Sequence, residues 1–105
     1  MKIQSRLALM TVLTAMTAAA VAQGAADTYK AKCVMCHAAD GSGDTPAGKA
    51  MKVPAFAAPD AIKASDAELI AITKTGKGKM PAYAGKIPDD QIKDLVAYIR
   101  TLQKK

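Results

Sequence analysis

The chain has two cysteines and one histidine, and all three stand within the five-residue run Cys33-Val34-Met35-Cys36-His37. A Cys-x-x-Cys-His run is typical of covalent attachment of c-type haem. The two thiols add to the haem vinyl groups as thioethers, and their spacing places both sulfur atoms along one edge of a helical turn. The histidine that follows can then bind the iron from the proximal side of the ring. We therefore predict attachment of one haem through Cys33 and Cys36, with His37 as an axial iron ligand.

Three other uses of a Cys-x-x-Cys pair have less support from the rest of the sequence. A redox-active disulfide is usually preceded by a strand within a βαβ pattern, and neither is visible around Cys33. A zinc site needs about four nitrogen or sulfur ligands, and the chain offers no second cluster of cysteine or histidine. A structural disulfide between Cys33 and Cys36 would constrain little chain and would leave His37 without a role.

The N-terminal segment has the pattern of a secretory signal peptide. Lys2 and Arg6 form a positive n-region, and residues 7–21 are apolar or weakly polar. Ala20-Val21-Ala22 matches the small-x-small rule for cleavage, which predicts removal of residues 1–22. A retained membrane anchor is the alternative, but the apolar stretch is short for a membrane span and is interrupted by three threonines.

Cleavage would leave one domain of 83 residues, 23–105, with no membrane span. We expect it in the periplasm, because bacteria attach haem covalently on the outer side of the plasma membrane. A hydrophobic core of this size gives marginal stability without a disulfide, metal or cofactor, so we expect the chain to fold poorly without its haem. The formal charge of +6 falls to +4 without Lys2 and Arg6. One arginine then remains and no basic stretch is interleaved with aromatic residues, so no nucleic-acid binding is expected.

The mature sequence predicts an all-α fold of helices joined by Gly/Pro-rich loops, with no alternating strand pattern. A first helix is expected from Ala25 to His37. Ser65-Asp66-Ala67-Glu68 forms a capping box and opens a second helix that ends near Gly76. A short helical turn at residues 60–63 fits between them, and residues 38–53 and 76–81 are expected to be loops.

The last predicted helix follows Pro88 and carries acidic residues in its first turn, where the helix dipole favours them. Apolar residues recur at helical spacing along it and predict one buried face. These residues are Ile92, Leu95, Val96, Ile99 and Leu102. Basic residues, Arg100 among them, suit the C-terminal end of the helix.

The sixth position of the haem iron decides between an electron carrier and a ligand-binding or catalytic protein. There is no second histidine, and the mature chain has three methionines, Met35, Met51 and Met80. Met35 lies inside the attachment run, too close in sequence to reach the distal face. Met80 stands in a Gly/Pro-framed loop, 43 residues after His37. Met51 is interpreted as core filler, a common use of methionine.

The mature chain resembles the class I c-type cytochromes, close to the short bacterial monohaem kind. Cys33, Cys36 and His37 match the attachment motif of that family. Lys79-Met80-Pro81-Ala82-Tyr83 matches its distal Met-Pro segment, and Leu95-Val96-Ala97-Tyr98-Ile99 matches its C-terminal helix. The resemblance implies a small cytochrome c fold, with three to four helices around one covalently bound haem c. It also implies a periplasmic one-electron carrier of a respiratory or photosynthetic chain, and not an enzyme.

The resemblance also implies roles for further residues. Met80 would be the second axial ligand of the iron. An aromatic residue of the last helix would pack against a small residue of the first helix, for which Ala25 and Gly24 are both candidates. The carbonyl group of a proline would accept a hydrogen bond from the Nδ1 of His37, and Pro46 is the candidate.

Five lysines lie in or near the segments expected around the haem edge: Lys49, Lys52, Lys77, Lys79 and Lys86. They could steer the protein to acidic redox partners, or they could form an ordinary solvated face. A monomer is assumed.

Three rival functions are a small peroxidase or haem subunit, a gas sensor in which Met80 dissociates, and a thiol-redox protein. The first would need a distal acid–base side chain, which the mature chain does not offer. Carbon monoxide binding to the reduced protein would identify the sensor, and failure to retain haem on denaturation would favour the thiol-redox protein.

Overall fold

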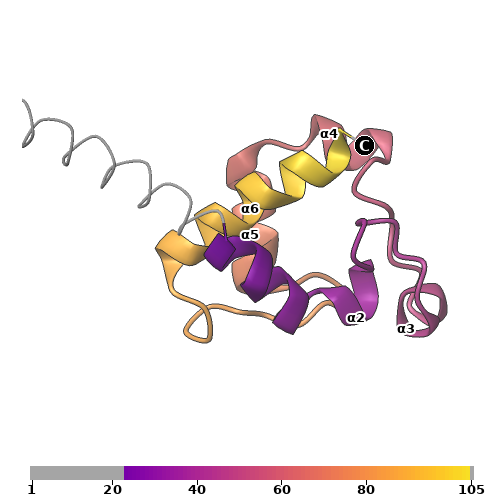
Figure 1. Cartoon of the computed structure of the whole chain (residues 1–105), viewed down its shortest axis with the longest axis horizontal. Coiled ribbons are helices and arrows are strands. Elements are labelled where there is room, and N and C mark those ends of the chain that lie inside the picture. The colour runs from indigo at the N-terminus through magenta and orange to yellow at the C-terminus, as the bar shows by residue number, and fades with distance from the viewer. Residues whose placement is uncertain (1–22, 105) are drawn as a thin grey trace, which may run out of the picture.

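The computed structural model describes residues 23–104, and this part of the chain is helical with connecting loops (Figure 1). Residues 23–32 form a helix, called here the N-terminal helix. The others are α2 (Val34–His37), α3 (Pro46–Ala50), α4 (Pro59–Lys63), α5 (Asp66–Thr75) and α6 (Asp89–Gln103). Between residues 23 and 104 there is no strand, and only the isolated bridges Lys77–Met80 and Ala84–Ile87 pair extended backbone. The predicted all-α class is confirmed.

The predicted signal peptide, residues 1–22, lies outside the described residues. None of the helices between residues 23 and 104 combines the length and the apolar composition that a membrane span requires.

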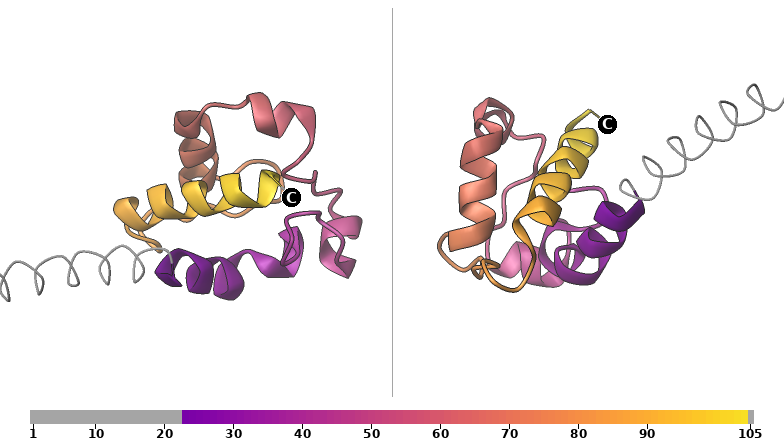
Figure 2. Two further views of the ribbon diagram at one scale, coloured as in Figure 1. Left: turned by 45° about the horizontal axis from the view of Figure 1, so that its top comes forward. Right: turned by 90° about the vertical axis from the view of Figure 1, so that its left-hand side faces the viewer.

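Helix α6 lies between the N-terminal helix on one side and α4 and α5 on the other (Figure 2). Its apolar stripe is as predicted for most of its length: Ile92, Leu95, Val96 and Leu102 are buried, and Ile99 is partly buried. Tyr29 of the N-terminal helix belongs to the same core cluster. Burial of these apolar side chains stabilises the packing of α6 against the N-terminal helix.

Helix α5 begins and ends where the sequence predicts. The Ser65 hydroxyl accepts a hydrogen bond from the Glu68 N–H at 3.1 Å, which is one half of the capping box. Gly76 ends the helix with φ of 78°, a conformation that favours glycine. A Cβ atom at Gly76 would also come within 2.6 Å of the Met80 carbonyl oxygen. Both the positive φ and this close approach therefore require glycine.

Two predictions of secondary structure were wrong. The expected helix from Ala25 to His37 is interrupted by a turn at Cys33, after which α2 begins. The expected loop at 38–53 contains α3, because Thr45 caps it by accepting from the Gly48 N–H at 2.9 Å and Pro46 occupies its first position. Glycine and proline suggested a loop, yet here proline starts a helix. The predicted turn at 60–63 is confirmed as α4.

Two packing predictions can be compared with the structure. The ring of Tyr98 in α6 packs on the Tyr29 ring of the N-terminal helix, with centroids 5.2 Å apart, a contact that the sequence did not predict. Of the two candidates, Ala25 is buried, whereas a Cβ at Gly24 would meet open space. Met51 is 43 % exposed at the end of α3, so its interpretation as core filler was wrong.

Arg100 ties α6 to the connection between α4 and α5. Its guanidinium pairs with Asp66 at 2.9 Å and donates hydrogen bonds to the carbonyl oxygens of Ala61 and Ala64. The sequence suggested only that a basic residue suits the end of a helix. The structure shows that this arginine joins three elements.

Candidate haem-binding site

Cys33 lies at the turn between the N-terminal helix and α2, and Cys36 lies within α2. Both are free thiols and both are partly buried. The Cys36 N–H donates to the Cys33 carbonyl at 3.3 Å and the His37 N–H donates to the same carbonyl at 2.9 Å, which keeps the run in one helical turn. Such a turn presents both thiols and the imidazole within one short stretch of chain, as thioether attachment requires.

The thiol of Cys33 has the properties of a buried group and not of a reactive one. Burial raises the pKa of Cys33 to about 11. Redox-active cysteines have a lowered pKa and a positive or polar environment. This environment gives no support to a thiol-redox role. Nor is there a group of three or more His, Cys, Asp or Glu side chains suited to a metal ion in residues 23–104.

His37 has a buried imidazole with an unsatisfied nitrogen. Within the described residues, its Nδ1 atom has no hydrogen-bond partner, so the predicted bond to the Pro46 carbonyl is not formed. Burial lowers the pKa of His37, which favours the neutral ring that can bind a metal. A buried polar group without a partner is rare in folded proteins, which marks the environment of this imidazole as unusual.

Phe56 lies against the histidine ring and was not singled out by sequence reasoning. The two ring centroids are 4.6 Å apart and the ring planes are 18° from parallel. Phe56 follows Pro54 in a segment without periodicity, so no local signal in the sequence indicated this contact.

Met80 lies in a tight loop that is anchored on α5. The N–H groups and carbonyl oxygens of Lys77 and Met80 are paired at 3.0 and 3.2 Å, with Gly78 at positive φ between them. After Met80, the Tyr83 N–H donates to the Thr73 carbonyl at 3.0 Å. The Met80 side chain is partly buried.

One long-range hydrogen bond connects this loop to the attachment run. The Tyr83 hydroxyl donates to the Lys32 carbonyl oxygen at 3.2 Å, across 51 positions of sequence. Lys32 directly precedes Cys33 in the chain. The fold therefore brings the Met80 segment and the attachment run to the same part of the molecule, although the sequence separates them widely.

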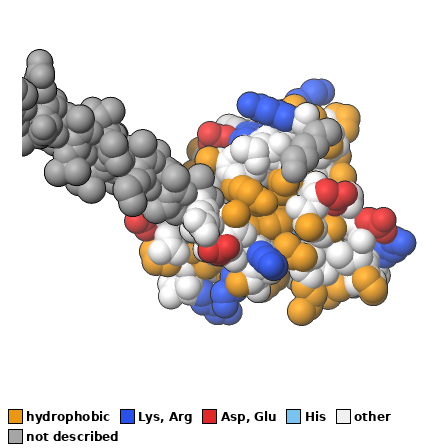
Figure 3. Space-filling model, in the orientation of Figure 1, with side chains coloured by type: hydrophobic (Ala, Val, Ile, Leu, Met, Phe, Trp, Pro, Cys, Tyr) orange, Lys and Arg blue, Asp and Glu red, His pale blue; other side chains and the backbone are white. Residues whose placement is uncertain are grey.

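Apolar side chains are gathered beside these residues. Figure 3 shows hydrophobic side chains in the middle of the face between α6 and α2. Leu95 and Val96 are buried, and three further apolar residues are partly buried: Leu69, Ile70 and Ile99. Partly covered apolar side chains beside two free thiols and an unpartnered imidazole fit a large flat apolar group such as haem.

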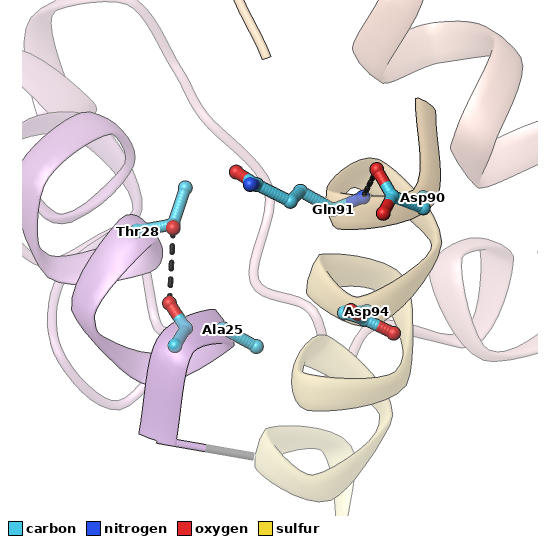
Figure 4. A pocket seen from close by; sticks show the side chains of 6 residues that line it. Ala25, Thr28, Asp90, Gln91 and Asp94 are labelled. Carbon is cyan, nitrogen blue, oxygen red and sulfur yellow. Dashed lines mark hydrogen bonds between the residues drawn. The ribbon is translucent and has the colours of Figure 1, made fainter. Parts of the chain in front are cut away.

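A separate cavity of about 290 Å³ lies where the N-terminal helix meets the start of α6 (Figure 4). It is lined by polar and small residues: Gly24, Ala25, Thr28, Asp90, Gln91 and Asp94. Thr28 donates to the Gly24 carbonyl at 2.9 Å, and the Asp90 carboxylate accepts from the Gln91 N–H at 3.0 Å. None of its lining side chains is a thiol, imidazole or thioether, so this cavity has none of the groups that would hold haem.

Comparisons with known proteins identify the family of this chain. Residues 19–99 match the family described as "Cytochrome C oxidase, cbb3-type, subunit III". The chain is 36 % identical over 73 residues to cytochrome c6 of Leptolyngbya boryana, covering 68 % of this chain and 80 % of that relative. It is 33 % identical over 93 residues to cytochrome c6 of Thermosynechococcus vestitus, covering 89 % of this chain and 80 % of that relative. The chain therefore belongs to the class I monohaem c-type cytochromes, electron carriers with one covalently bound haem c.

Proposed function

We propose that this protein carries single electrons between redox partners of a respiratory or photosynthetic chain, with His37 and Met80 as the axial ligands of its iron. Cys33 and Cys36 would hold the haem as thioethers. The observation that carries the proposal is the hydrogen bond from the Tyr83 hydroxyl to the Lys32 carbonyl. It links the only Met-Pro segment of the mature chain to the residue before the attachment run.

When bound, the haem supplies the one-electron couple of its iron. His37 and Met80 would occupy both axial positions in both redox states, so no ligand would have to move during electron exchange. The thioether of Met80 favours ferrous iron more than a second imidazole would. Buried Leu95 and Val96 exclude water nearby, which acts in the same direction.

The loop around Met80 is suited to hold a ligand in one position. Its backbone is paired internally between Lys77 and Met80, and Pro81 has a fixed φ and restricts the backbone of Met80, which precedes it. The following segment is bonded to α5 through Tyr83 and Thr73. A rigid loop of this kind reduces the freedom of the methionine to leave the iron, which favours a carrier over a gas sensor.

We further propose that residues 1–22 are a cleaved signal peptide and that residues 23–105 act as a monomeric domain in the periplasm. The support is the sequence pattern of the first 22 residues and the need for haem attachment outside the plasma membrane.

Steering by lysines toward acidic redox partners is also proposed. All five candidates are exposed: Lys49, Lys52, Lys77, Lys79 and Lys86. Lys49 pairs with Asp44 at 3.0 Å, but both side chains are well exposed, so the pair is weak and leaves the steering field largely intact. The rate of reaction with an acidic partner should fall as salt concentration rises, and a salt-independent rate would contradict steering.

The visible spectrum of the mature holoprotein tests the axial ligands. We expect sharp c-type bands when it is reduced and, when it is oxidised, the weak far-red band of iron–methionine ligation. Met80→Ala should abolish the far-red band, whereas the matched control Met51→Ala should keep it. Covalent haem without the far-red band in the wild-type protein would overturn His/Met ligation, and rapid carbon monoxide binding would then point to a sensor.

A further inference from the structure

We propose that Phe56 positions the His37 imidazole by stacking on its face. This stacking would replace a hydrogen bond at Nδ1, which is missing. The inference rests on the proposed role of His37 as an iron ligand. The two rings are nearly parallel, 18° apart, with centroids separated by 4.6 Å. Within the described residues Nδ1 has no hydrogen-bond partner, so no such bond sets the ring orientation.

A face contact leaves the chemistry of the imidazole available. Both ring nitrogens direct their proton or lone pair within the plane of the ring, away from an aromatic ring stacked on its face. Phe56 can therefore restrict rotation of the imidazole without competing for Nε2 or Nδ1. The preferred offset stacking of aromatic rings gives this contact a defined geometry, which a branched aliphatic side chain would not provide.

Phe56 is itself held firmly. Its N–H donates to the Gly41 carbonyl at 2.9 Å. Gly41 has φ of +78°, and a Cβ atom there would come within 2.6 Å of the Phe56 ring. The Tyr29 ring also lies near Phe56: the two ring centroids are 6.3 Å apart and the ring planes are inclined at 57°. The absence of a side chain at Gly41 thus allows the close approach that seats Phe56 against His37.

Hydrogen bonds to the carbonyl groups of His37 and Ala38 fix the main chain of the histidine. The His37 carbonyl accepts from the Gly43 N–H at 2.8 Å, and the Tyr29 hydroxyl donates to the Ala38 carbonyl at 2.6 Å. These bonds set the position of the main chain but leave rotation of the His37 ring free. The aromatic stack of Phe56, in contrast, acts on the ring itself.

The test uses the oxidised holoprotein and the variants Phe56→Leu, Phe56→Tyr and Tyr98→Leu. The pattern of haem methyl proton shifts and the g values of ferric haem report the orientation of the axial ligands. We expect Phe56→Leu to change both and Phe56→Tyr to restore the wild-type pattern. Tyr98→Leu removes an aromatic ring that packs at a tilt against Tyr29 in the same core, so it should lower the melting temperature without changing the pattern.

An unchanged methyl-shift pattern and unchanged g values in Phe56→Leu, with only a lower melting temperature, would overturn the proposal. If that variant does not accumulate, Phe56→Met supplies the same measurement with a longer, unbranched side chain, and the same result would overturn it. Failure of the proposed function is distinguishable, because the wild-type protein would then lack the far-red methionine band before any substitution at Phe56.

Discussion

Two halves of the molecule differ in how completely they bury their apolar residues. Where α6 meets the N-terminal helix, Ile92 is fully buried and Tyr29 and Leu95 are 1 % exposed. Between residues 44 and 72, which include α3 and α4, Gly48 alone is buried, and Ile62 is 52 % exposed. The first region forms a core from its own side chains. The second region buries few apolar side chains of its own, so we expect bound haem to supply an apolar partner on that side.

Removal of haem should have the largest effect on stability, and the two regions should respond to it differently. A core of this size rarely supplies more than about 3–5 kcal/mol, so the Cys33→Ala/Cys36→Ala chain is expected to lose cooperative folding. Amide hydrogen exchange should become fast in α3 and α4 first, while residual protection remains near Tyr29 and Leu95. Circular dichroism and hydrogen exchange measure both, and a cooperative, native-like melt would contradict the expectation.

Truncation of one apolar side chain in each region should show how much burial in that region contributes to stability. Leu95→Ala in the holoprotein is expected to cost about 3 kcal/mol, since it creates a cavity among fully buried neighbours. The control Ile62→Ala should cost less than about 0.5 kcal/mol, because that side chain is half exposed. Denaturant unfolding gives both values, and equal losses would mean that the core extends into the second region.

Arg100 is one of the contacts between the two regions, and its loss should weaken the attachment of α4 and the start of α5 to α6. Arg100→Ala is expected to destabilise the protein by roughly 2 kcal/mol, because two carbonyl oxygens and Asp66 lose a charged donor. Lys93→Ala, an exposed change on the same helix, serves as the control. If thermal melts show the same stability for both variants, the arginine contacts contribute nothing measurable.

The smallest effect should come from the Tyr29 hydroxyl, which donates to the Ala38 carbonyl at 2.6 Å. Tyr29→Phe is expected to cost about 1 kcal/mol at neutral pH. Burial raises the pKa of Tyr29, so the folded state keeps its proton more tightly than the unfolded state. Its contribution is complete below the unfolded pKa of about 10 and falls as pH rises above that value.

Stability measured by urea unfolding from neutral to strongly alkaline pH tests this sign. The advantage of the wild-type protein over Tyr29→Phe should shrink above pH of about 10. An advantage that grows with pH would mean that Tyr29 ionises more readily in the folded protein, which contradicts the effect of burial.

Local patterns predicted the elements whose causes lie within one turn of chain. The Ser65 cap, the stop at Gly76 and the buried stripe of α6 all follow from neighbours three or four residues apart. The same is true of the haem-attachment run, because Cys33, Cys36 and His37 carry their chemistry in their spacing.

The sequence by itself therefore determined the all-α class, the cofactor and the family, which depend on local spacing and on a short motif. Tertiary structure alone decided the break at Cys33, the contacts of Arg100 and the stack of Phe56 on His37. These features join residues that are distant in sequence, or depend on what lies across the fold. Local propensity carries no information about such contacts, since their energy exists only after the chain has folded and brought the partners together.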